Sequence, residues 1–410
     1  MAKEYKDLIV GLDIGTAKVM CVVAEVLSEG EMRLVGLGVS ASHGLKRGVV
    51  VNIDATVQSI QHALKEAELM AACKIERVHT GITGSHIRGQ NSSGMVIVRD
   101  NREVTAVDVA RVVETAKAIN IPNDQRLLLV EPQEFVIDGH EVKEPIGMSG
   151  NRLEVKVHIV TGAQSAAENI LKCVRRCGLE VEHLVLNPSA SSLSVLSADE
   201  KDLGVALVDI GAGTTDVAIF TDGSIRHTAV IPIAGDLITS DIAMALRTPT
   251  KDAEEIKVEH GVAKQLLADA GAQLEVPGLG DRAPRMLSRQ ALAGVIEPRV
   301  EEIYSLVHQV IRESGYEELL SSGIVITGGS AVMPGMVELG EDIFLKPVRK
   351  GVPTYSGALY DMVANPRSAT VMGLLEEARL GRARGHKASS QTSSVKSMFS
   401  RAKDWIVGNF

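Results

Sequence analysis

The sequence predicts an α/β protein with two related large domains around a shared cleft, a small inserted α+β subdomain and an amphipathic helix at the C-terminus. A strand–turn–strand pattern that begins with Asp-x-Gly occurs at residues 13–18 and again at residues 209–216. Between residues 84 and 156 the pattern of apolar and turn residues differs from that on either side. Residues 395–410 place their apolar side chains at helical spacing. With 410 residues, 45% of them hydrophobic, the chain can bury the cores of two or more domains.

The second of the repeated patterns, Asp-Ile-Gly-Ala-Gly-Thr-Thr-Asp at residues 209–216, predicts a hairpin turn that binds phosphate. Gly211 and Gly213 are expected to take positive φ angles, which bring the backbone close to a ligand. Successive backbone N–H groups in such a turn form an anion-binding concavity. Asp209, at the end of an apolar run, suits a metal ion or an attacking water. An ordinary glycine-rich hairpin is the alternative for this turn taken alone. The predicted phosphate-binding residues are Gly211, Ala212, Gly213, Thr214 and Thr215.

Two further turns of the same kind favour a binding site over an ordinary hairpin. The N-terminal one, Asp-Ile-Gly-Thr-Ala-Lys at 13–18, lies between two apolar runs, and the third, Gly-Gly-Ser at 328–330, follows the apolar run 323–327. The chain has no Gly-x4-Gly-Lys-Ser/Thr motif, and a hairpin does not match the strand-to-helix context of a dinucleotide fingerprint. The candidate residues in these two turns are Asp13, Gly15, Thr16, Ala17, Lys18, Gly328, Gly329 and Ser330.

In this order, the three turns resemble the phosphate-1, phosphate-2 and adenosine motifs of the superfamily that contains actin, heat-shock chaperones and hexokinase. Within it, the chain resembles the FtsA family of bacterial cell-division proteins over essentially all of its 410 residues. The resemblance implies an actin-like fold with ATP between the two large domains and Mg²⁺ near Asp13 and Asp209, held through water. It is also carried by Gly-Leu-Lys-Arg-Gly at 44–48, Pro-Gln-Glu-Phe at 132–135, Asp-Ala-Glu-Glu-Ile-Lys at 252–257, Val-Ile-Glu-Pro-Arg at 295–299 and the amphipathic C-terminus.

The predicted division of the chain follows from these motifs and from the periodicity of apolar residues. Residues 8–40 predict three strands, residues 54–73 a helix and residues 77–83 a fourth strand. The predicted units are 1–83 with 157–201 for the first domain, 84–156 for the inserted subdomain, 202–234 with 308–380 for the second domain, 235–307 for its smaller subdomain, 381–394 for a flexible linker and 395–410 for a membrane-targeting helix.

In the inserted subdomain, Thr105 and Asp108 have the spacing of a capping box and predict a helix that runs to Ile119. A second capping box, Ser165 with Glu168, is expected to open the helix that follows the insertion. The alternative for the inserted residues is an extension of the main sheet. The resemblance implies that other division proteins bind the insertion. Strands are expected at 127–130, 134–137 and 157–161, the last of them back in the first domain.

Asn187 opens a segment that resembles the first connector helix between the two large domains. In many relatives a Gln or Glu at this place helps to orient water. Asn187 can hydrogen-bond water but is shorter, and an amide is not a base. Hydrolysis is therefore expected to be slow, with Asp209 as the other candidate catalytic residue. The second connector helix is expected at 368–380, where Ala369 and Gly373 permit close approach of helices.

Two further candidate sites lie on predicted helices of the second domain. Glu254 and Lys257 are three residues apart and share a helix face, and the resemblance implies that they contact ribose and adenine. The alternative for this pair is a solvated salt bridge. Arg299 is implied to face the tubulin-like partner FtsZ, at its C-terminal tail, because arginine binds carboxylates bidentately. An ordinary surface salt bridge is the alternative for Arg299.

The distribution of charge predicts a basic tail on an acidic body. The formal net charge is −9, but the residues from Arg379 onward include seven Lys/Arg and one acid, so residues 1–378 carry about −15 (36 basic against 51 acidic residues). This distribution argues against nucleic acid as a partner and favours a tail that binds anionic inner-membrane lipid. Residues 381–394 have the composition of a flexible tether. The apolar stripe of the last helix is Val395, Met398, Phe399, Ala402, Trp405, Ile406 and Phe410, and Lys396, Arg401 and Lys403 lie beside it.

With the resemblance, these features predict an actin-like ATP-binding protein that anchors the FtsZ ring to the cytoplasmic face of the inner membrane at the division site and helps to assemble the septal division machinery. It is expected to form filaments whose state ATP sets, and to be at most a slow ATPase. Four cysteines without zinc spacing, and no signal peptide, predict a reduced, cytosolic, peripheral protein. The alternatives are another actin-like membrane adaptor, of pilus assembly or cell shape, and a small-molecule kinase of the same superfamily. A kinase would need a catalytic Asp that faces an acceptor hydroxyl, and the sequence offers only the acids of the phosphate turns.

Overall fold

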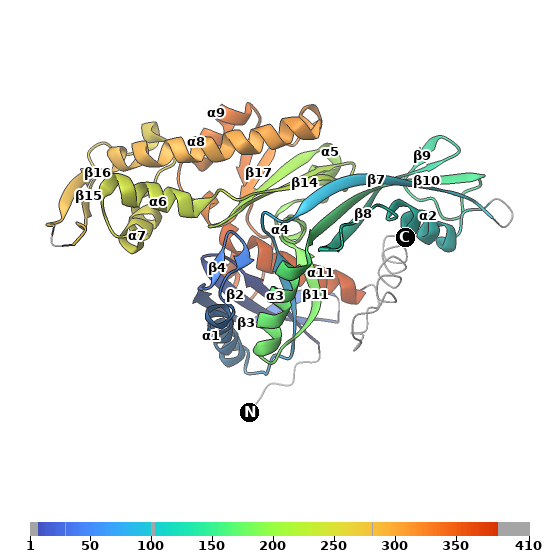
Figure 1. Ribbon diagram of the computed structural model, residues 1–410, viewed down its shortest axis with the longest axis horizontal. Coiled ribbons are helices and arrows are strands. Elements are labelled where there is room, and N and C mark those ends of the chain that lie inside the picture. Colours follow the sequence, from blue (N-terminus) through green and yellow to red (C-terminus); the bar gives the residue numbers. More distant parts are fainter. Residues whose placement is uncertain (1–6, 29, 100–102, 281, 384–410) are drawn as a thin grey trace.

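The computed structural model describes residues 7–28, 30–99, 103–280 and 282–383 of the chain (Figure 1). These residues form two large α/β domains, and a smaller α+β domain projects to one side. Most of the predicted linker and all of the predicted amphipathic helix, with its candidate membrane residues, lie outside the described residues. No helix in the described part of the chain is long and apolar enough to cross a bilayer.

The first domain is a five-stranded sheet covered by helices on both faces. Its elements are β1 (Leu8–Ile14), β2 (Lys18–Val26), β3 (Met32–Ala41), the small hairpin β4 (Leu45–Lys46) and β5 (Val49–Val50), α1 (Ile53–Ala71), β6 (Arg77–Ile82), α3 (Gln164–Arg176), β11 (Glu180–Leu186) and α4 (Asn187–Val195). The strand order is β11-β6-β1-β2-β3, with β1 antiparallel to β2 and parallel to β6. Strand residues alternate between a core shared with α1 and α3 and a core shared with α11 (Ala369–Ala383).

The second domain repeats this topology. Its sheet is formed by β12 (Val205–Ile210), β13 (Thr215–Thr221), β14 (Ser224–Ile231), β17 (Ile324–Thr327) and β18 (Val348–Lys350), in the order β14-β13-β12-β17-β18. As in the first domain, the central strand has an antiparallel meander on one side and parallel strands on the other. The prediction of two related large domains is therefore confirmed.

Helices α6 (Gly235–Leu246), α8 (Arg289–Ser314) and α9 (Met336–Phe344) pack on one face of the second sheet, and Tyr304 of α8 is fully buried there. Figure 1 shows α6 and α8 extending away from the sheet beside α7. The remaining elements are α5 (Ala198–Leu203), α7 (Thr250–His260), β15 (Gln273–Val276), β16 (Arg285–Ser288), α10 (Tyr360–Val363) and the 3₁₀ turns η1 (Gln265–Leu267), η2 (Glu317–Leu319), η3 (Ser330–Val332) and η4 (Pro366–Ser368).

The insertion is a four-stranded sheet with one helix. It contains β7 (Arg88–Ile97), α2 (Ala106–Ala116), β8 (Gln125–Ile137), β9 (His140–Val142) and β10 (Arg152–Ala163), in the strand order β7-β10-β8-β9. The capping box of Thr105 and Asp108 is confirmed, although α2 ends at Ala116 and not at Ile119. The two strands expected at 127–130 and 134–137 are one continuous strand, β8.

The expected return to the first domain at residue 157 does not occur. Strand β10 runs unbroken from Arg152 to Ala163 and pairs with β7 and β8 along its length. Its residues Val157 and Ile159 belong to the core of the insertion, whereas Val160 on the opposite face joins the core of the first domain. Strand β10 thus contributes side chains to two cores. The periodicity of its apolar residues alone does not reveal which sheet it pairs with.

The predicted capping box of Ser165 and Glu168 is also wrong. Helix α3 follows β10 directly, its cap residue Ala163 makes no side-chain hydrogen bond, and its first residue is Gln164. The N–H of Gln164 donates to the backbone oxygen of Asp124 at 2.8 Å. A neighbouring segment therefore satisfies one of the four N–H groups that a helix N-terminus leaves without an intrahelical partner.

The insertion emerges from the first domain but is hydrogen-bonded to the edge strand of the second. Gln133 Nε2 donates to Ile225 O at 2.8 Å, and Asn91 Nδ2 donates to Arg226 O at 3.1 Å. Between them, His158 contacts Thr228 Oγ1 through Nε2 at 2.9 Å. Burial lowers the pKa of His158 to about 4, so it is neutral near pH 7. Figure 1 shows β7, β8 and β14 side by side at this junction.

Helices α4 and α11 pack on each other, with α11 also against β1 of the first sheet and α4 against β12 of the second. A Cβ on Gly373 of α11 would lie 1.7 Å from the backbone oxygen of Ala190 in α4. A Cβ on Gly11 of β1 would lie 2.9 Å from the oxygen of Val371. The absence of a side chain at Gly373 therefore lets the two helix backbones touch.

Candidate functional site

The two repeated turns have the same backbone hydrogen bond. The N–H of Gly15 donates to Lys18 O at 2.9 Å between β1 and β2, and the N–H of Gly211 donates to Thr214 O at 2.9 Å between β12 and β13. The expectation that Gly211 and Gly213 take positive φ angles is wrong. A Cβ at Gly211 would lie 3.2 Å from Thr214 O, a tight contact that a small shift of the turn could accommodate.

The two turns are in contact with each other. A Cβ on Gly213 would lie 2.6 Å from Thr16 Oγ1 and 2.8 Å from the Cα of Arg47, both in the first domain. The N–H of Gly48 donates to the same Thr16 hydroxyl at 3.2 Å. Residues 13–18 and 209–216, far apart in sequence, are therefore brought together as the sequence predicts.

The third turn and the start of α6 pack on the phosphate-2 turn. Ser330 Oγ and the N–H of Gly235 both donate to Gly211 O at 3.1 Å. Gly328 has a φ of +86°, and a Cβ there would lie 2.4 Å from Asp209 Oδ1. The three turns and the N-terminus of α6 form one contiguous cluster, and a helix N-terminus adds positive potential that favours an anion.

The two threonines of the phosphate-2 turn differ in what their hydroxyls do. Thr215 Oγ1 donates to Ile233 O at 2.7 Å, which ties β13 to the segment that leads into α6. Thr214 Oγ1 lies 3.5 Å from Asp216 Oδ2. The hydroxyl of Thr215 is therefore structural in this conformation, and Thr214 is the residue whose hydroxyl faces the acids.

Three buried carboxyl groups, those of Asp13, Asp209 and Asp216, lie in this cluster. Burial raises the pKa of Asp13 to about 6, with Lys18 opposing the shift and Asp209 adding to it. Burial and the nearby Asp209 raise the pKa of Asp216 to about 8, against hydrogen bonds from Thr83 and Thr214. Such a group of acids attracts cations, although no three His, Cys, Asp or Glu side chains of the described residues form a ready-made metal cage.

Asp216 lies in this cluster but was not among the site residues predicted from the sequence motifs. Its side chain accepts a hydrogen bond from Thr83 Oγ1 of the first domain, so it links the first domain to the second. In the β12–β13 register Asp209 lies directly opposite Asp216. Like charges at opposed positions destabilise a strand pair. This hairpin register, which follows from the turn length, is the signal that could have identified Asp216.

Replacing Asp216 by asparagine is expected to stabilise the metal-free protein at high pH. A carboxyl whose folded pKa lies above its unfolded value binds more protons folded than unfolded, so stability falls as pH rises from about 4 to about 8. The amide of an asparagine cannot ionise, and we expect Asp216→Asn to gain at least about 2 kcal/mol at pH 8, since each unit by which the pKa is raised is worth about 1.4 kcal/mol. The gain should vanish near pH 4.

Urea unfolding in a chelator-containing buffer at pH 4.5, 6.5 and 8 measures this effect. Glu301→Gln, at an exposed position of α8, is the matched control for loss of one acid. A pH-independent difference between Asp216→Asn and wild type would contradict the raised pKa.

Asp209 connects the site to two helices. Its Oδ2 accepts from Ser191 Oγ of α4 at 2.7 Å and from Thr370 Oγ1 of α11 at 3.3 Å. Burial raises the pKa of Asp209, and these two hydrogen bonds oppose the shift. Asp209 therefore links the phosphate-2 turn to both α4 and α11.

Asn187 presents a buried acceptor without a partner among the described residues. Its Oδ1 makes no hydrogen bond, and a Cβ on the neighbouring Gly81 would lie 2.2 Å from it. A buried amide oxygen left unpaired is costly, and an ordered water is the usual remedy. The predicted water-orienting role of Asn187 stays a prediction.

Glu254 and Lys257 form more than the solvated pair considered as an alternative. Lys257 Nζ donates to Glu254 Oε2 at 2.6 Å, to Thr239 Oγ1 at 2.8 Å and to Gly235 O at 3.2 Å. The Lys257 side chain is only 11% exposed. It therefore joins α7 to the first turn of α6, which rests on Gly211.

Lys18 and Arg299, the two other candidate cations, are engaged within the protein. Lys18 Nζ donates to Arg367 O at 2.5 Å, and burial lowers its pKa. Arg299 on α8 binds both carboxylate oxygens of Asp241, at 2.5 and 3.1 Å, and also pairs with Glu302. The structure thus places Arg299 in the salt bridge considered as its alternative, with 23% of its side chain exposed.

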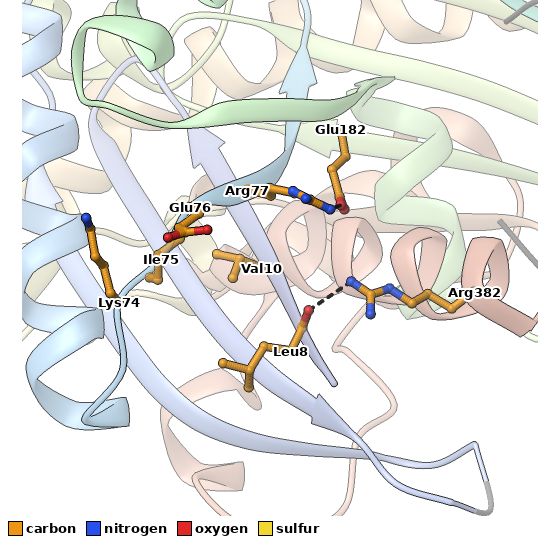
Figure 2. Close-up of a pocket in the computed structure, with 8 residues that line it drawn as sticks. All are labelled: Leu8, Val10, Lys74, Ile75, Glu76, Arg77, Glu182 and Arg382. Atoms are coloured by element: carbon orange, nitrogen blue, oxygen red, sulfur yellow. Dashed lines mark hydrogen bonds and ion pairs between the residues drawn. The ribbon is translucent and has the colours of Figure 1, made fainter. Parts of the chain in front are cut away.

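A cavity of about 200 Å³ lies at the opposite end of the strands from the three turns (Figure 2). It is bounded by Leu8 at the start of β1, whereas the phosphate-1 turn follows the end of that strand. Figure 2 shows Arg77 pointing to Glu182, and Arg382 Nη2 donates to Leu8 O at 3.0 Å. These charged groups interact with other groups of the protein. Because the cavity lies at the opposite end of the strands, it is separate from the predicted site.

Comparisons with known proteins agree with the fold and with the motifs. The family model "Cell division protein FtsA" matches residues 206–373, and "SHS2 domain inserted in FTSA" matches residues 84–161. The chain is 55% identical over 410 residues to "Cell division protein FtsA" of Pseudomonas aeruginosa, covering 98% of each chain. It is 43% identical over 415 residues to that of Escherichia coli (strain K12), covering 99% of each.

Among solved structures, the chain is similar to the "PilM-PilN type IV pilus biogenesis complex", with a TM-score of 0.66, 19% identity and coverage of 90% of this chain and 98% of that chain. It is also similar to MreB5 of Spiroplasma citri bound to ADP, with a TM-score of 0.55, 16% identity and coverage of 93% and 99%. Likenesses at these identities concern the fold alone.

The duplicated sheets, the packed helices α4 and α11 and the three turns that meet between the sheets define an actin-like protein, here with an inserted α+β domain. Two relatives named cell division protein FtsA are more than 40% identical to the chain along nearly its whole length, which identifies the family within this class. The chain belongs to the FtsA family of cell-division proteins.

Proposed function

We propose that the chain binds ATP between its two large domains and anchors the FtsZ ring to the cytoplasmic face of the inner membrane at the division site. The observation that carries the nucleotide part is the contact of the three turns, in which Thr16, Gly213 and Ser330 come from sequence positions far apart. Glycines that leave room for a phosphate chain and backbone N–H groups that bind it are what such a ligand requires.

The acids fit a magnesium ion that accompanies the phosphates. Asp13 and Asp209 would hold Mg²⁺ through water, since oxygen ligands and retained waters are what Mg²⁺ prefers. When bound, the ion neutralises charge on the β- and γ-phosphates. Asn187 would orient a water with its unpaired oxygen but cannot take its proton. The protein is therefore proposed as an adaptor with at most slow ATPase activity.

The partner surfaces follow from the family and from the charge of the chain. FtsZ would bind the smaller subdomain of the second domain, residues 235–307. Arg299 can take part only by exchanging Asp241 for a carboxylate of the FtsZ tail, because its guanidinium is occupied. Filament formation by the actin-like body would present many C-terminal segments at once, which raises membrane avidity. The insertion would bind other division proteins.

Co-sedimentation with liposomes and FtsZ, with and without ATP, tests this proposal. The full chain is expected to carry FtsZ into the pellet of anionic vesicles, more strongly with ATP. Trp405→Glu places a charge on the apolar stripe of the C-terminal segment and is expected to reduce vesicle binding at least tenfold, about 1.4 kcal/mol, without changing ATP affinity.

Leu69→Glu is the control, because Leu69 is an apolar residue that is 73% exposed on α1, away from the C-terminal segment in sequence. A Trp405→Glu protein that sediments with vesicles as well as wild type would overturn the membrane anchor. Wild-type protein that pellets while FtsZ stays in the supernatant would overturn the FtsZ assignment.

A further inference from the structure

The hairpin at residues 45–50 lies beside the phosphate turns, but none of its side chains has been given a role in ligand binding so far. Its strands pair Leu45 with Val50 and Lys46 with Val49, so Arg47 and Gly48 form a two-residue turn. Their φ angles are +49° and +77°. Two consecutive positive φ angles are the signature of a type I′ turn, which favours Asn-Gly or Gly-Gly. Arginine in the first of these positions is therefore held in a disfavoured conformation.

This turn lies where the first domain touches the phosphate-2 turn. The Cα and N of Arg47 are 2.8 and 3.0 Å from the position of a Cβ on Gly213. A Cβ on Gly48 would lie 3.1 Å from the backbone oxygen of Thr83, whose hydroxyl donates to Asp216. The N–H of Gly48 also donates to Thr16 Oγ1 at 3.2 Å. The turn thus contacts both phosphate turns and the residue that bridges the cleft.

The Arg47 side chain is exposed and, within residues 7–383 as the structure describes them, forms no hydrogen bond or ion pair. By contrast, Arg33 and Arg77 in the same domain are paired with glutamates. An unpaired guanidinium beside two anion-binding turns is available to a ligand. Its planar fork matches phosphate oxygens bidentately.

We propose that Arg47 is a specificity-determining residue of the nucleotide site: its guanidinium binds the terminal phosphate of a nucleoside triphosphate and so distinguishes it from a diphosphate. The inference rests on the proposed ATP binding. Disfavoured backbone conformations persist where the surrounding structure fixes them, and they cluster at ligand-binding positions. A terminal phosphate held by Arg47 and by the turn around Gly213 would also tie the first domain to the second.

Calorimetric titration of the full chain with Mg·ATP and with Mg·ADP tests this role. Arg47→Gly is the informative variant, because glycine adopts positive φ without strain and the variant should melt at the same or a higher temperature than wild type. It is expected to lower ATP affinity at least tenfold, about 1.4 kcal/mol, while ADP affinity stays within twofold. Arg47→Lys should retain part of the difference. Lys46→Ala, the exposed cation next to it, should change neither affinity.

The outcomes separate this inference from the proposed function. Wild-type protein that binds neither nucleotide would overturn the ATP site itself. Wild-type protein that binds both equally, or an Arg47→Gly variant that keeps the wild-type ATP/ADP ratio, would leave the ATP site intact and overturn the role of Arg47. An equal loss of ATP and ADP affinity in Arg47→Gly would also contradict it, because the residue would then support the site as a whole.

Discussion

Replacing Gly373 by alanine is expected to lower the free energy of unfolding by about 3 kcal/mol, at the upper end of what overpacking costs. A Cβ on Gly373 would lie 1.7 Å from the oxygen and 2.2 Å from the carbonyl carbon of Ala190. Both atoms belong to the backbone of α4, so no side-chain rotation can relieve the clash. The helices must move apart, and α4 carries Ser191, whose hydroxyl holds Asp209. The substitution should therefore weaken nucleotide binding as well as stability.

Gly381 offers a matched control on the same helix. Nothing lies within 4 Å of a Cβ at Gly381, so Gly381→Ala tests the change in helix propensity alone and should be neutral or slightly stabilising, by up to about 1 kcal/mol. Urea unfolding of both variants gives the comparison. Equal stability of Gly373→Ala and Gly381→Ala would show that α4 and α11 do not touch at Gly373.

Features that repeat locally could be predicted from the sequence. The Asp-x-Gly hairpins at 13–18 and 209–216 each need only a few consecutive residues, and their duplication is enough to imply two similar sheets. The close approach at Gly373 was predictable for a similar reason, since a glycine inside a helix pattern usually has a packing role. In these cases the residue that the local pattern favours is also the residue that the tertiary packing requires.

Features that depend on long-range pairing could not be predicted in the same way. Residues 157–161 are a buried apolar run that fits either sheet, and the choice is made by pairing with β7 and β8. The sequence alone does not show that the Arg299 guanidinium is paired. Its partner Asp241 is 58 residues away, and only the packing of α6 on α8 brings the two together. The glycines of the phosphate-2 turn were expected to have positive φ angles, whereas neither does, and at Gly213 it is the neighbouring Arg47 backbone that leaves no room for a Cβ.

The strongest functional effect is expected from Gly213→Ala, which should reduce ATP affinity at least a hundredfold, about 2.7 kcal/mol. A Cβ at Gly213 would lie 2.6 Å from Thr16 Oγ1 and 2.8 Å from the Cα of Arg47. The hydroxyl can rotate away, but the Arg47 backbone can move only if the hairpin of residues 45–50 leaves the cleft. The variant should therefore fold, with a cleft that cannot close on the phosphates.

Comparison with Gly211→Ala distinguishes a cleft that cannot close on the phosphates from a general defect of the phosphate-2 turn. A Cβ at Gly211 meets only Thr214 O, at 3.2 Å and within the same turn, so a shift of a few tenths of an ångström accommodates it. We expect Gly211→Ala to lose less than tenfold in ATP affinity and to unfold within about 1 kcal/mol of wild type, since Gly211 has no positive φ. Gly213→Ala should remain folded but lose about 1–3 kcal/mol of stability, because its Cβ meets the backbone of Arg47. Calorimetric titration with Mg·ATP, after urea unfolding has confirmed that both variants are folded, measures the difference. If Gly213→Ala binds ATP as tightly as Gly211→Ala, the contact between the two phosphate turns is not part of the ATP-bound state, and the nucleotide must bind to an open cleft.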